Sequence, residues 1–481
     1  MEKYILNPDI KIIPNKTRNV LYRIDSFFHS PDKIAPIAPA DSIFLLLFDG
    51  TRTMDDVRKD FLRVFKECKD INVDRTINIL KKRLGIDDLL VDASELSMED
   101  LSRYGNRVDP VSLVLTKEKF DMKDGDLRLD APLSLNYNVA TSCPFSCKYC
   151  YHPLNDIKPF IPLDRVKTVL SQFKENGCES VMLSGGDPML RPDIDEIMEH
   201  LHNIDLFYTL STKSIISKKR IDKLIEKAGL DRIQISLDSS RSDVVEKVIG
   251  APNGYFNACI DQIKYMLSCG IDVRAKSVLT SFVADYLDEY FDMLDSLGVR
   301  HVQVVGYGRS GSRHEDSLFP TEEQMSYAAE VVEKAKKKYP DMCIVGGGYS
   351  VQTAEPVGKN CPVFDKRSVC NAGRFCVTML PNGEVTVCEQ LPYDKRYIIG
   401  DLSQEDLMDW WNGEKVKKWL SPPSREIFKD GVACKTCEEG LYTKCHQKYS
   451  RCLRFCREYY GSTEMPDTRC PEAEYPPIRI Q

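Results

Sequence analysis

The sequence lacks the features that would place it in a membrane, outside the cell or on nucleic acid. No apolar run in the 481 residues approaches the ~18 uncharged residues of a transmembrane helix. Residues 1–14 contain neither the apolar core nor the cleavage site of a secretory signal. The net charge is −7, which argues against binding to nucleic acid or to an anionic membrane surface. The sequence therefore predicts a cytoplasmic protein with neither nucleic acid nor membrane as a partner.

Cysteine is almost absent from the first part of the chain and abundant in the last. Only Cys68 precedes residue 143, whereas nine of the 18 cysteines lie between Cys370 and Cys470. In a cytosolic chain of this length, cysteines bind metals or carry out redox chemistry more often than they form disulfides. The seven histidines form no group with metal-ligand spacing. The cysteines are therefore the candidate metal ligands.

Residues 1–100 are typical of a small separate domain. Strand-like stretches cover residues 10–27, and three short helical segments follow. Thr53 is a candidate N-cap of the second helix, and Gly85 ends the third. The expected apolar stripe of the second helix consists of Val57, Phe61, Val64 and Phe65. This order of elements predicts a winged helix-turn-helix.

The charge of this domain argues against DNA as its ligand. Residues 1–100 contain 16 Lys and Arg against 18 Asp and Glu, a net charge of −2. A DNA-binding domain would present a basic face. We therefore expect the domain to bind a peptide or to pack on the rest of the chain. Residues 101–130 are polar and charged and are interpreted as a linker.

Residues 131–345 alternate between strand and helix patterns. The helical stripes include Val166, Val169, Leu170 and Phe173, and also Ile194, Ile197, Met198 and Leu201. The expected strands are residues 133–139, 181–184, 207–211, 232–237, 273–279 and 301–305. Six β/α units are too few for an eightfold barrel, so the pattern predicts an α/β fold with a partial (β/α)6 barrel. Its site is expected at the carboxyl ends of the strands.

Residues 346–481 lose this alternation and are rich in cysteine, proline and glycine. Such a composition is typical of a region that folds around metal rather than around a large apolar core. It predicts a separate cysteine-rich domain.

Three cysteines follow the first expected strand of the barrel: Cys143, Cys147 and Cys150. Three thiolates within eight residues can hold three irons of a 4Fe–4S cluster, leaving the fourth iron open to a small molecule. A structural zinc site fits less well because it prefers two separated ligand pairs. Buried cysteines without a metal are the remaining alternative.

The Cys-x3-Cys-x2-Cys spacing, with Tyr149 before the last cysteine, resembles the signature of the radical S-adenosylmethionine (SAM) superfamily. Further motifs resemble the SAM-binding segments of that superfamily, and each stands in or after a successive strand. The resemblance assigns SAM binding to Gly185, Gly186, Asp187, Pro188, Ser211, Thr212, Ser236, Asp238, Arg274 and Val304. It also implies that SAM, bound to the open iron, is cleaved to methionine and a 5′-deoxyadenosyl radical that abstracts hydrogen from a C–H bond.

The C-terminal cysteines resemble a SPASM domain, which carries two auxiliary 4Fe–4S clusters and brings the expected total to three. By matched position, the first auxiliary cluster would be held by Cys370, Cys376, Cys388 and Cys452, and the second by Cys434, Cys437, Cys445 and Cys470. The spacings from Cys437 to Cys445 and from Cys445 to Cys452 are longer than usual, so Cys456 competes with Cys452 as a ligand of the first cluster. Cys376 has a counterpart only in some relatives. Zinc is the alternative metal. Glu389 stands where some SPASM enzymes have a catalytic base, although it is also consistent with a solvated charge.

The first domain resembles the RiPP recognition element of ribosomal-peptide maturases, with the match lying in the segment LLLFDGTRTMDDV. Such elements bind a leader peptide as an added strand. Together, the resemblances imply a maturase that crosslinks a precursor peptide, most closely the sactipeptide and ranthipeptide synthases that make Cys thioethers. An electron donor such as flavodoxin or ferredoxin would be a second partner. The alternatives are a sulfatase-maturing or other SPASM dehydrogenase, and a non-catalytic iron–sulfur electron carrier or redox regulator.

Overall fold

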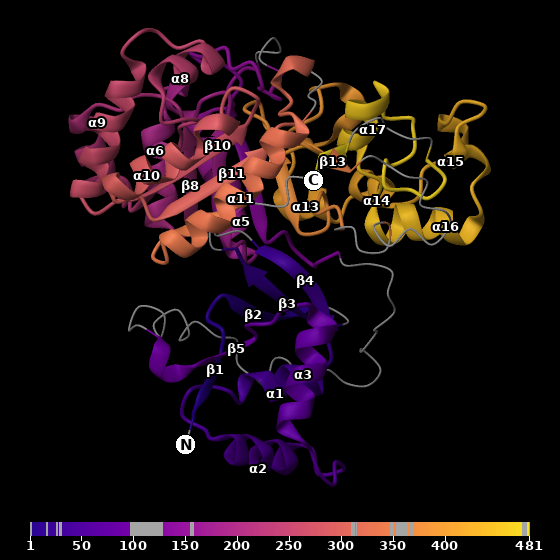
Figure 1. The fold of residues 1–481 in the computed structure, drawn as a ribbon. Helices are drawn as coiled ribbons and strands as arrows, with labels where there is room; N and C mark the ends of the chain where they lie inside the picture. The colour runs from indigo at the N-terminus through magenta and orange to yellow at the C-terminus, as the bar shows by residue number, and fades with distance from the viewer. Residues whose placement is uncertain are drawn as a thin grey trace. The chain divides into compact units, whose positions relative to one another are not determined.

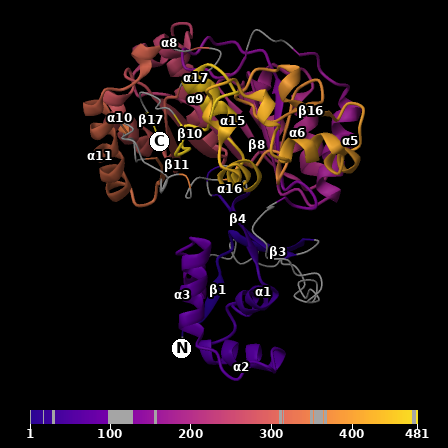
Figure 2. The same cartoon turned by 90° about the vertical axis from the view of Figure 1, so that its right-hand side faces the viewer.

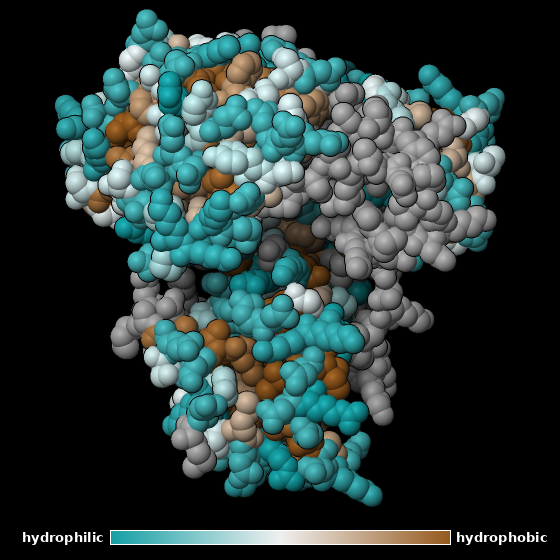
Figure 3. All heavy atoms as spheres, in the orientation of Figure 1, coloured by the Kyte–Doolittle hydropathy of each residue, from teal (hydrophilic) through white to brown (hydrophobic). Residues whose placement is uncertain are grey.

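The computed structural model describes residues 2–15, 18–25, 27, 31–96, 128–153, 158–308, 313, 315–346, 351–352, 364, 369–473 and 479–480. The predicted linker over 101–130 lies almost entirely outside these residues. The chain divides into two compact units, residues 1–130 and 131–481. None of the described helices is both long enough and apolar enough to cross a membrane. The face shown in Figure 3 is mainly hydrophilic, with hydrophobic residues in separate patches.

The first unit combines a small antiparallel sheet with three helices (Figure 2). Its sheet has the order β2-β3-β4, so β2 and β4 are edge strands, and β1 pairs separately with β5. The elements are β1 (Tyr4–Leu6), β2 (Ile10–Asn15), β3 (Arg18–Ile24), β4 (Pro31–Ile37), α1 (Pro39–Leu46), α2 (Met54–Val64), α3 (Val73–Leu84), β5 (Leu90–Asp92) and η1 (Ala93–Glu95).

Helices α2 and α3 begin and end at the signals in the sequence. The Thr53 hydroxyl accepts from the Asp56 backbone N–H and the Asp56 carboxylate accepts from the Thr53 N–H, a capping box that satisfies two otherwise unpaired donors. Gly85 ends α3 in the left-handed region, with φ 67°. One expected position of the apolar stripe is wrong, since Val64 is 56% exposed, whereas Phe65 packs against Phe61 with ring centroids 4.6 Å apart.

The second unit is built on a ten-stranded sheet with the order β12-β11-β10-β9-β8-β7-β6-β14-β15-β16. All neighbours from β12 to β14 are parallel. The six predicted strands are confirmed as β6 (Ser134–Ala140), β7 (Ser180–Gly185), β8 (Phe207–Thr212), β9 (Arg232–Ser236), β10 (Asp272–Leu279) and β11 (His301–Gly306). A seventh parallel strand, β12 (Cys343–Val345), was not predicted because three residues show no periodicity.

Helices pack along the outside of this sheet (Figure 1). They are α5 (Leu163–Glu175), α6 (Ile194–Asn203), α7 (Lys218–Ala228), α8 (Ser242–Ile249), α9 (Tyr255–Ser268), α10 (Leu287–Leu297) and α11 (Glu322–Lys338). The eight side chains predicted as the buried stripes of α5 and α6 are all fully buried. Their apolar faces stabilise the barrel by removing nonpolar area from water.

The cysteine-rich region extends the sheet of the barrel. Strand β14 (Cys376–Met379) pairs in parallel with β6, placing Cys376 opposite Ser134. The other elements are β13 (Val351–Gln352), β15 (Glu384–Thr386), β16 (Ile398–Asp401), α13 (Leu407–Trp411), α14 (Glu414–Leu420), α15 (Ala433–Thr436), α16 (Glu439–Thr443), the π-helical turn η9 (Lys444–Tyr449), α17 (Leu453–Tyr460) and β17 (Arg479–Ile480). The barrel and the start of the cysteine-rich region therefore share one sheet and one hydrophobic core.

Candidate functional site

The loop after β6 brings Cys143, Cys147 and Cys150 to one cavity of about 340 Å³. This volume is within the usual range for small-molecule sites. Burial raises the pKa of Cys143 to about 11 and that of Cys147 to about 12. Buried thiols of this kind deprotonate when they bind a metal cation, so the donor set fits an iron–sulfur cluster.

The glycines after β7 lie directly against the start of this loop. A Cβ on Gly185 would lie 2.1 Å from the Ala140 carbonyl oxygen, and one on Gly186 would lie 2.1 Å from the Ser142 carbonyl oxygen. The Gly186 N–H donates to the Ala140 carbonyl at 2.8 Å. Only glycine at these two positions permits this packing on the loop that carries the cysteines.

Asp187 connects the same segment to the end of β8. Its carboxylate accepts from the Thr212 hydroxyl at 2.8 Å and from the Lys213 and Ser214 backbone N–H groups at 3.0 and 3.1 Å. Asp187 and Thr212 are nearly inaccessible. Pro188 follows in the short turn η4 (Pro188–Leu190). These residues line or support the cavity and hold two strand ends together.

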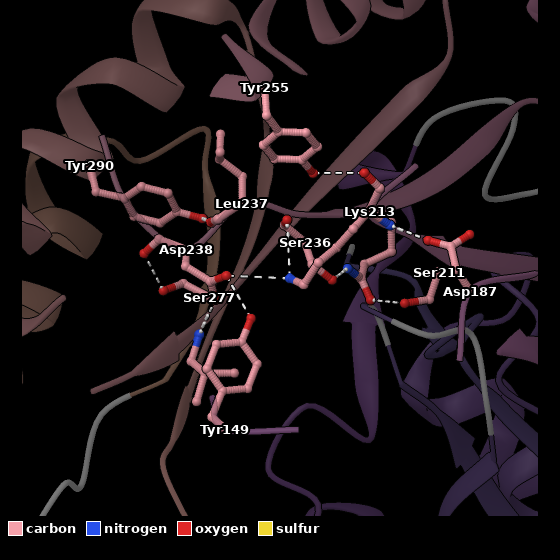
Figure 4. A network of polar contacts seen from close by, with 12 residues as sticks. Tyr149, Asp187, Ser211, Lys213, Ser236, Leu237, Asp238, Tyr255, Ser277 and Tyr290 are labelled. Carbon is pink, nitrogen blue, oxygen red and sulfur yellow. Dashed lines mark hydrogen bonds and ion pairs between the residues drawn. The ribbon is translucent and has the colours of Figure 1, made fainter. Parts of the chain in front are cut away.

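Asp238 is the centre of a polar network at the ends of β8, β9 and β10 (Figure 4). Its carboxylate accepts from the Tyr149 hydroxyl at 2.6 Å and from the Val278 N–H at 3.1 Å, and it lies 3.3 Å from the Lys213 ammonium. Burial lowers the pKa of Lys213, but the Asp238 carboxylate raises it, and the net shift is upward. Because Tyr149 belongs to the cysteine loop, Asp238 holds that loop on the barrel.

Three of the residues predicted to bind SAM do not line the cavity: Pro188, Arg274 and Val304. Arg274 is buried in an ion pair with Asp272, with 2.8 Å between the guanidinium and the carboxylate, and does not line the cavity. Lys276, two residues further along β10, does line it, and burial lowers the pKa of this ammonium. Val304 is a core residue, whereas Val305 and Gly306 reach the cavity. The alternation of side chains along a strand puts Arg274 and Lys276 on the same face of β10. It does not indicate which of the two lies close enough to the end of the strand to reach the cavity.

The other predicted residues gather at the cavity. Ser211 and Ser236 line it together with Gly185, Gly186, Asp187, Thr212 and Asp238. The Ser211 hydroxyl donates to the side chain of Gln234 at 2.6 Å. The cavity is also lined by Lys213, Lys276, Gln390 and Arg454, which no motif in the sequence indicated.

Residues of the cysteine-rich region meet the inner side of the barrel next to the cavity. The Asn136 amide on β6 donates to the Glu389 carboxylate at 2.5 Å, and the Asn138 amide donates to the Tyr393 hydroxyl at 3.2 Å. The Tyr393 hydroxyl lies 3.1 Å from Nε2 of His152, which is buried in the cavity wall. Glu389, the predicted base, is therefore held by β6 near the cavity, and its catalytic role stays a prediction.

The C-terminal cysteines interact electrostatically within two sets of thiols. Burial, together with the nearby thiolates of Cys370 and Cys452, raises the pKa of Cys388 to about 12. Burial and the nearby thiolate of Cys370 also raise the pKa of Cys376, to about 11. Burial and three thiolates likewise raise the pKa of Cys470 to about 12, these neighbours being Cys434, Cys437 and Cys445.

Cys456 is fully buried, and its thiol donates to the Pro466 carbonyl at 3.4 Å. No group of three or more His, Cys, Asp or Glu side chains within the described ranges is arranged to hold a single metal ion.

The radical SAM superfamily model matches residues 137–303, and the iron–sulfur cluster-binding SPASM model matches residues 370–438. Among curated proteins, the chain is 26% identical over 310 residues to a PqqA peptide cyclase of Gluconobacter oxydans, covering 61% of this chain and 82% of the relative. A PqqA peptide cyclase of Streptomyces rochei is 23% identical over 364 residues, with 72% and 91% covered. A GTP 3′,8-cyclase of Helicobacter pylori is 27% identical over 317 residues, with 62% and 96% covered.

Similar solved structures include Streptococcus suis SuiB bound to S-adenosylmethionine, with a TM-score of 0.59, 18% identity and coverage of 97% of this chain and 99% of SuiB. SuiB bound to the precursor peptide SuiA has the same TM-score, with 17% identity and coverage of 98% and 100%. This likeness concerns the fold. With both family models matched, the two domains imply SAM and 4Fe–4S clusters as cofactors. The chain therefore contains a radical SAM domain over residues 137–303 and an iron–sulfur cluster-binding SPASM domain over residues 370–438.

Proposed function

We propose that this enzyme matures a ribosomally made precursor peptide by abstracting hydrogen from one residue and forming an intramolecular crosslink, a Cys thioether. The main supporting observation is that Gln390 and Arg454 of the cysteine-rich region line the same cavity as the three cysteines of the barrel loop. A peptide substrate is supported by the similarity to PqqA peptide cyclases. It is also supported by the structure of SuiB, which was solved with a bound precursor peptide. We place the enzyme in the cytoplasm.

The cofactor set proposed is SAM with three 4Fe–4S clusters, one on the barrel loop and two on the C-terminal cysteine groups. SAM and the barrel cluster supply the hydrogen-abstracting radical. The protein holds the cysteine loop through Gly186 and Asp238, and it closes the cavity with residues of both domains. Flavodoxin or ferredoxin is the proposed electron donor.

Residues 1–100 are proposed as the recognition element for the leader of the precursor. Two observations support this role: β2 and β4 are sheet edges that can accept an added strand, and the domain carries no basic excess. A tethered leader would raise the effective concentration of the core peptide at the cavity.

Mass spectrometry of a co-expressed precursor tests the activity. We expect each crosslink to remove about 2 Da, because one hydrogen atom would go to the SAM-derived radical and the second would leave as a proton, with its electron accepted by an auxiliary cluster. The matched control is the same precursor expressed with the Cys143→Ala enzyme, which should keep its full mass. An unmodified precursor together with turnover of GTP by the wild-type enzyme would contradict the peptide assignment and favour the chemistry of the GTP cyclase relatives.

Leader binding is tested separately by hydrogen exchange on the full chain. We expect the leader peptide to slow exchange of backbone amides in β2 or β4, because an added strand hydrogen-bonds to an edge. A leader of scrambled sequence is the control and should leave exchange unchanged. Protection confined to residues 131–481 would show that residues 1–100 are not the recognition element.

A further inference from the structure

The end of α8 contacts the cysteine loop of the barrel, although no motif in the sequence indicated it. Helix α8 ends at Ile249, and Gly250 follows in the left-handed region with φ 69°. The last carbonyl groups of a helix have no partner within that helix. Here the Ser146 N–H donates to the Ile249 carbonyl, and the Lys148 N–H donates to the Val248 carbonyl, both at 3.0 Å. The cysteine loop therefore supplies the hydrogen bonds that complete the end of α8.

These two hydrogen bonds flank Cys147, because Ser146 and Lys148 are its neighbours in the chain. Cys147 is also the most buried of the three cysteines on the loop. Gly250 leaves the space for this close approach, since a Cβ there would lie 2.2 Å from the Ser146 hydroxyl oxygen. The backbone on either side of Cys147 is thereby fixed on α8.

A ring contact holds the same loop to the first residue of α9. The rings of Phe145 and Tyr255 meet edge to face, with centroids 5.0 Å apart and an interplanar angle of 66°. Tyr255 is 5% exposed, and its hydroxyl donates to the Lys213 carbonyl at 2.7 Å (Figure 4). The Tyr255 side chain is therefore attached to the chain just after β8 and to the cysteine loop at the same time.

The segment that makes these contacts is itself held in place. One face of α8 is buried in the core of the barrel through Val244, Val245, Val248 and Ile249. Glu246 closes the turn that follows α8. Its carboxylate accepts from the Gly254 N–H at 2.9 Å, and its carbonyl accepts from the Ala251 N–H at 3.1 Å. Residues 248–255 thus form a fixed surface under the loop, called here the α8–α9 platform.

We propose that the α8–α9 platform positions Cys147 for the barrel cluster, and that Tyr255 is a positioning residue of the SAM site. The inference rests on the proposed role of the cysteine loop. The three thiols must hold the cluster in one geometry for SAM to reach the open iron. If the loop leaves the platform in part of the molecules, the apparent dissociation constant of SAM rises in proportion. Tyr255 does not line the cavity and acts through Phe145.

The first test replaces the Tyr255 ring. In Tyr255→Leu we expect the SAM dissociation constant to rise about three- to tenfold, the factor that an edge-to-face ring pair contributes. Tyr255→Phe keeps the ring and loses only the hydrogen bond to Lys213, so it should restore most of the wild-type affinity. Isothermal titration calorimetry with SAM on the anaerobically reconstituted full chain measures these affinities.

Electron paramagnetic resonance distinguishes positioning from a general loss of stability. SAM should change only the signal of the reduced barrel cluster, because each auxiliary cluster is assigned four cysteine ligands. We expect Tyr255→Leu to shift the g values of this SAM-dependent signal. Phe173→Leu shortens a fully buried side chain of α5 and should lower stability, but it should leave the g values and the SAM affinity unchanged.

Tyr265→Leu is the matched control on α9 itself. The Tyr265 hydroxyl donates to the Asp222 carboxylate on α7 at 2.6 Å, so this side chain is held to another helix rather than to the end of β8. Its replacement should leave both the SAM affinity and the g values unchanged.

The double variant Phe145→Leu/Tyr255→Leu tests whether the two rings act together. If they do, it should bind SAM no more weakly than the weaker of the two single variants. Additive losses would overturn the proposal, as would wild-type affinity and g values in Tyr255→Leu. If Tyr255→Leu assembles no cluster, Phe145→Leu decides, since wild-type affinity and g values in that variant contradict the platform.

The experiment separates this inference from the peptide assignment. A wild-type spectrum that does not respond to SAM would overturn the platform together with the proposed role of the cysteine loop. Neither the SAM titration nor the spectrum requires a peptide. An unmodified precursor would therefore remove only the crosslinking assignment and leave the role of the platform intact.

Discussion

Replacing Cys147 with alanine is expected to reduce the formation of 5′-deoxyadenosine from SAM to background. Cys147 is the most buried of the three cysteines on the barrel loop, and alanine offers no ligand to the iron that it would hold. Enzymes accelerate their reactions by roughly 10⁶-fold or more, and loss of the radical-generating cofactor forfeits nearly all of that factor. Anaerobic reconstitution with SAM and a chemical reductant, followed by chromatography of the nucleoside product, makes the measurement.

The matched control for this experiment is Cys269→Ala. Cys269 is an exposed cysteine at the end of α9, so its replacement should leave 5′-deoxyadenosine formation unchanged and alter stability by less than about 0.5 kcal/mol. Iron analysis of Cys147→Ala should show that the iron of the C-terminal cysteines is retained. Wild-type rates of SAM cleavage in Cys147→Ala would refute the assignment of this loop as the radical generator.

The strands and helices of the barrel could be predicted because their local patterns agree with the fold. The stripe of Val166, Val169, Leu170 and Phe173 has helical spacing, and all four residues are buried in the core that α5 shares with the sheet. The caps at Thr53 and Gly85 act through hydrogen bonds and backbone angles within a few residues. Signals of this kind depend on neighbours in sequence, so one sequence is enough to find them.

The extension of the sheet could not be predicted because it is decided by contacts between distant residues. Strands β14, β15 and β16 contain four, three and four residues, too few to show alternation. The partner of β14 is β6, more than two hundred residues earlier in the chain. Loss of the β/α alternation after residue 345 suggested a separate cysteine-rich domain, whereas its first strands complete the sheet of the barrel.

The candidate site shows the same division. The spacing of Cys143, Cys147 and Cys150 identified the loop, and strand order placed Gly185, Ser211 and Ser236 beside it. Which side chains reach the cavity depends on depth along the strands and on residues arriving from elsewhere. For that reason the sequence indicated Arg274 rather than Lys276 on β10, and it did not reveal that Arg454 would line the cavity.

The Asp238 network provides the second large expected effect. Asp238→Asn should destabilise the fold by about 3–5 kcal/mol, the usual result of removing one partner from a buried ion pair. The reason is that Lys213, whose side chain is only 12% exposed, keeps its charge while its partner becomes neutral. The Tyr149 hydroxyl also loses a charged acceptor, so the cysteine loop should loosen and SAM should bind more weakly. Guanidinium unfolding and SAM titration measure the two effects.

A second substitution separates the cost of leaving the Lys213 charge unpaired from the other effects of replacing Asp238. In Asp238→Asn/Lys213→Met the uncompensated ammonium is gone, so the double variant should be more stable than Asp238→Asn alone. Tyr149→Phe removes one hydrogen bond and should cost about 1 kcal/mol. The control Glu414→Gln alters an ion pair with Lys417 whose side chains are largely exposed, and it should shift stability by less than about 0.5 kcal/mol. If the double variant is as unstable as the sum of its single substitutions, burial of an unpaired Lys213 charge does not explain the loss, and the role of Asp238 must lie in hydrogen bonding to Tyr149 and Val278.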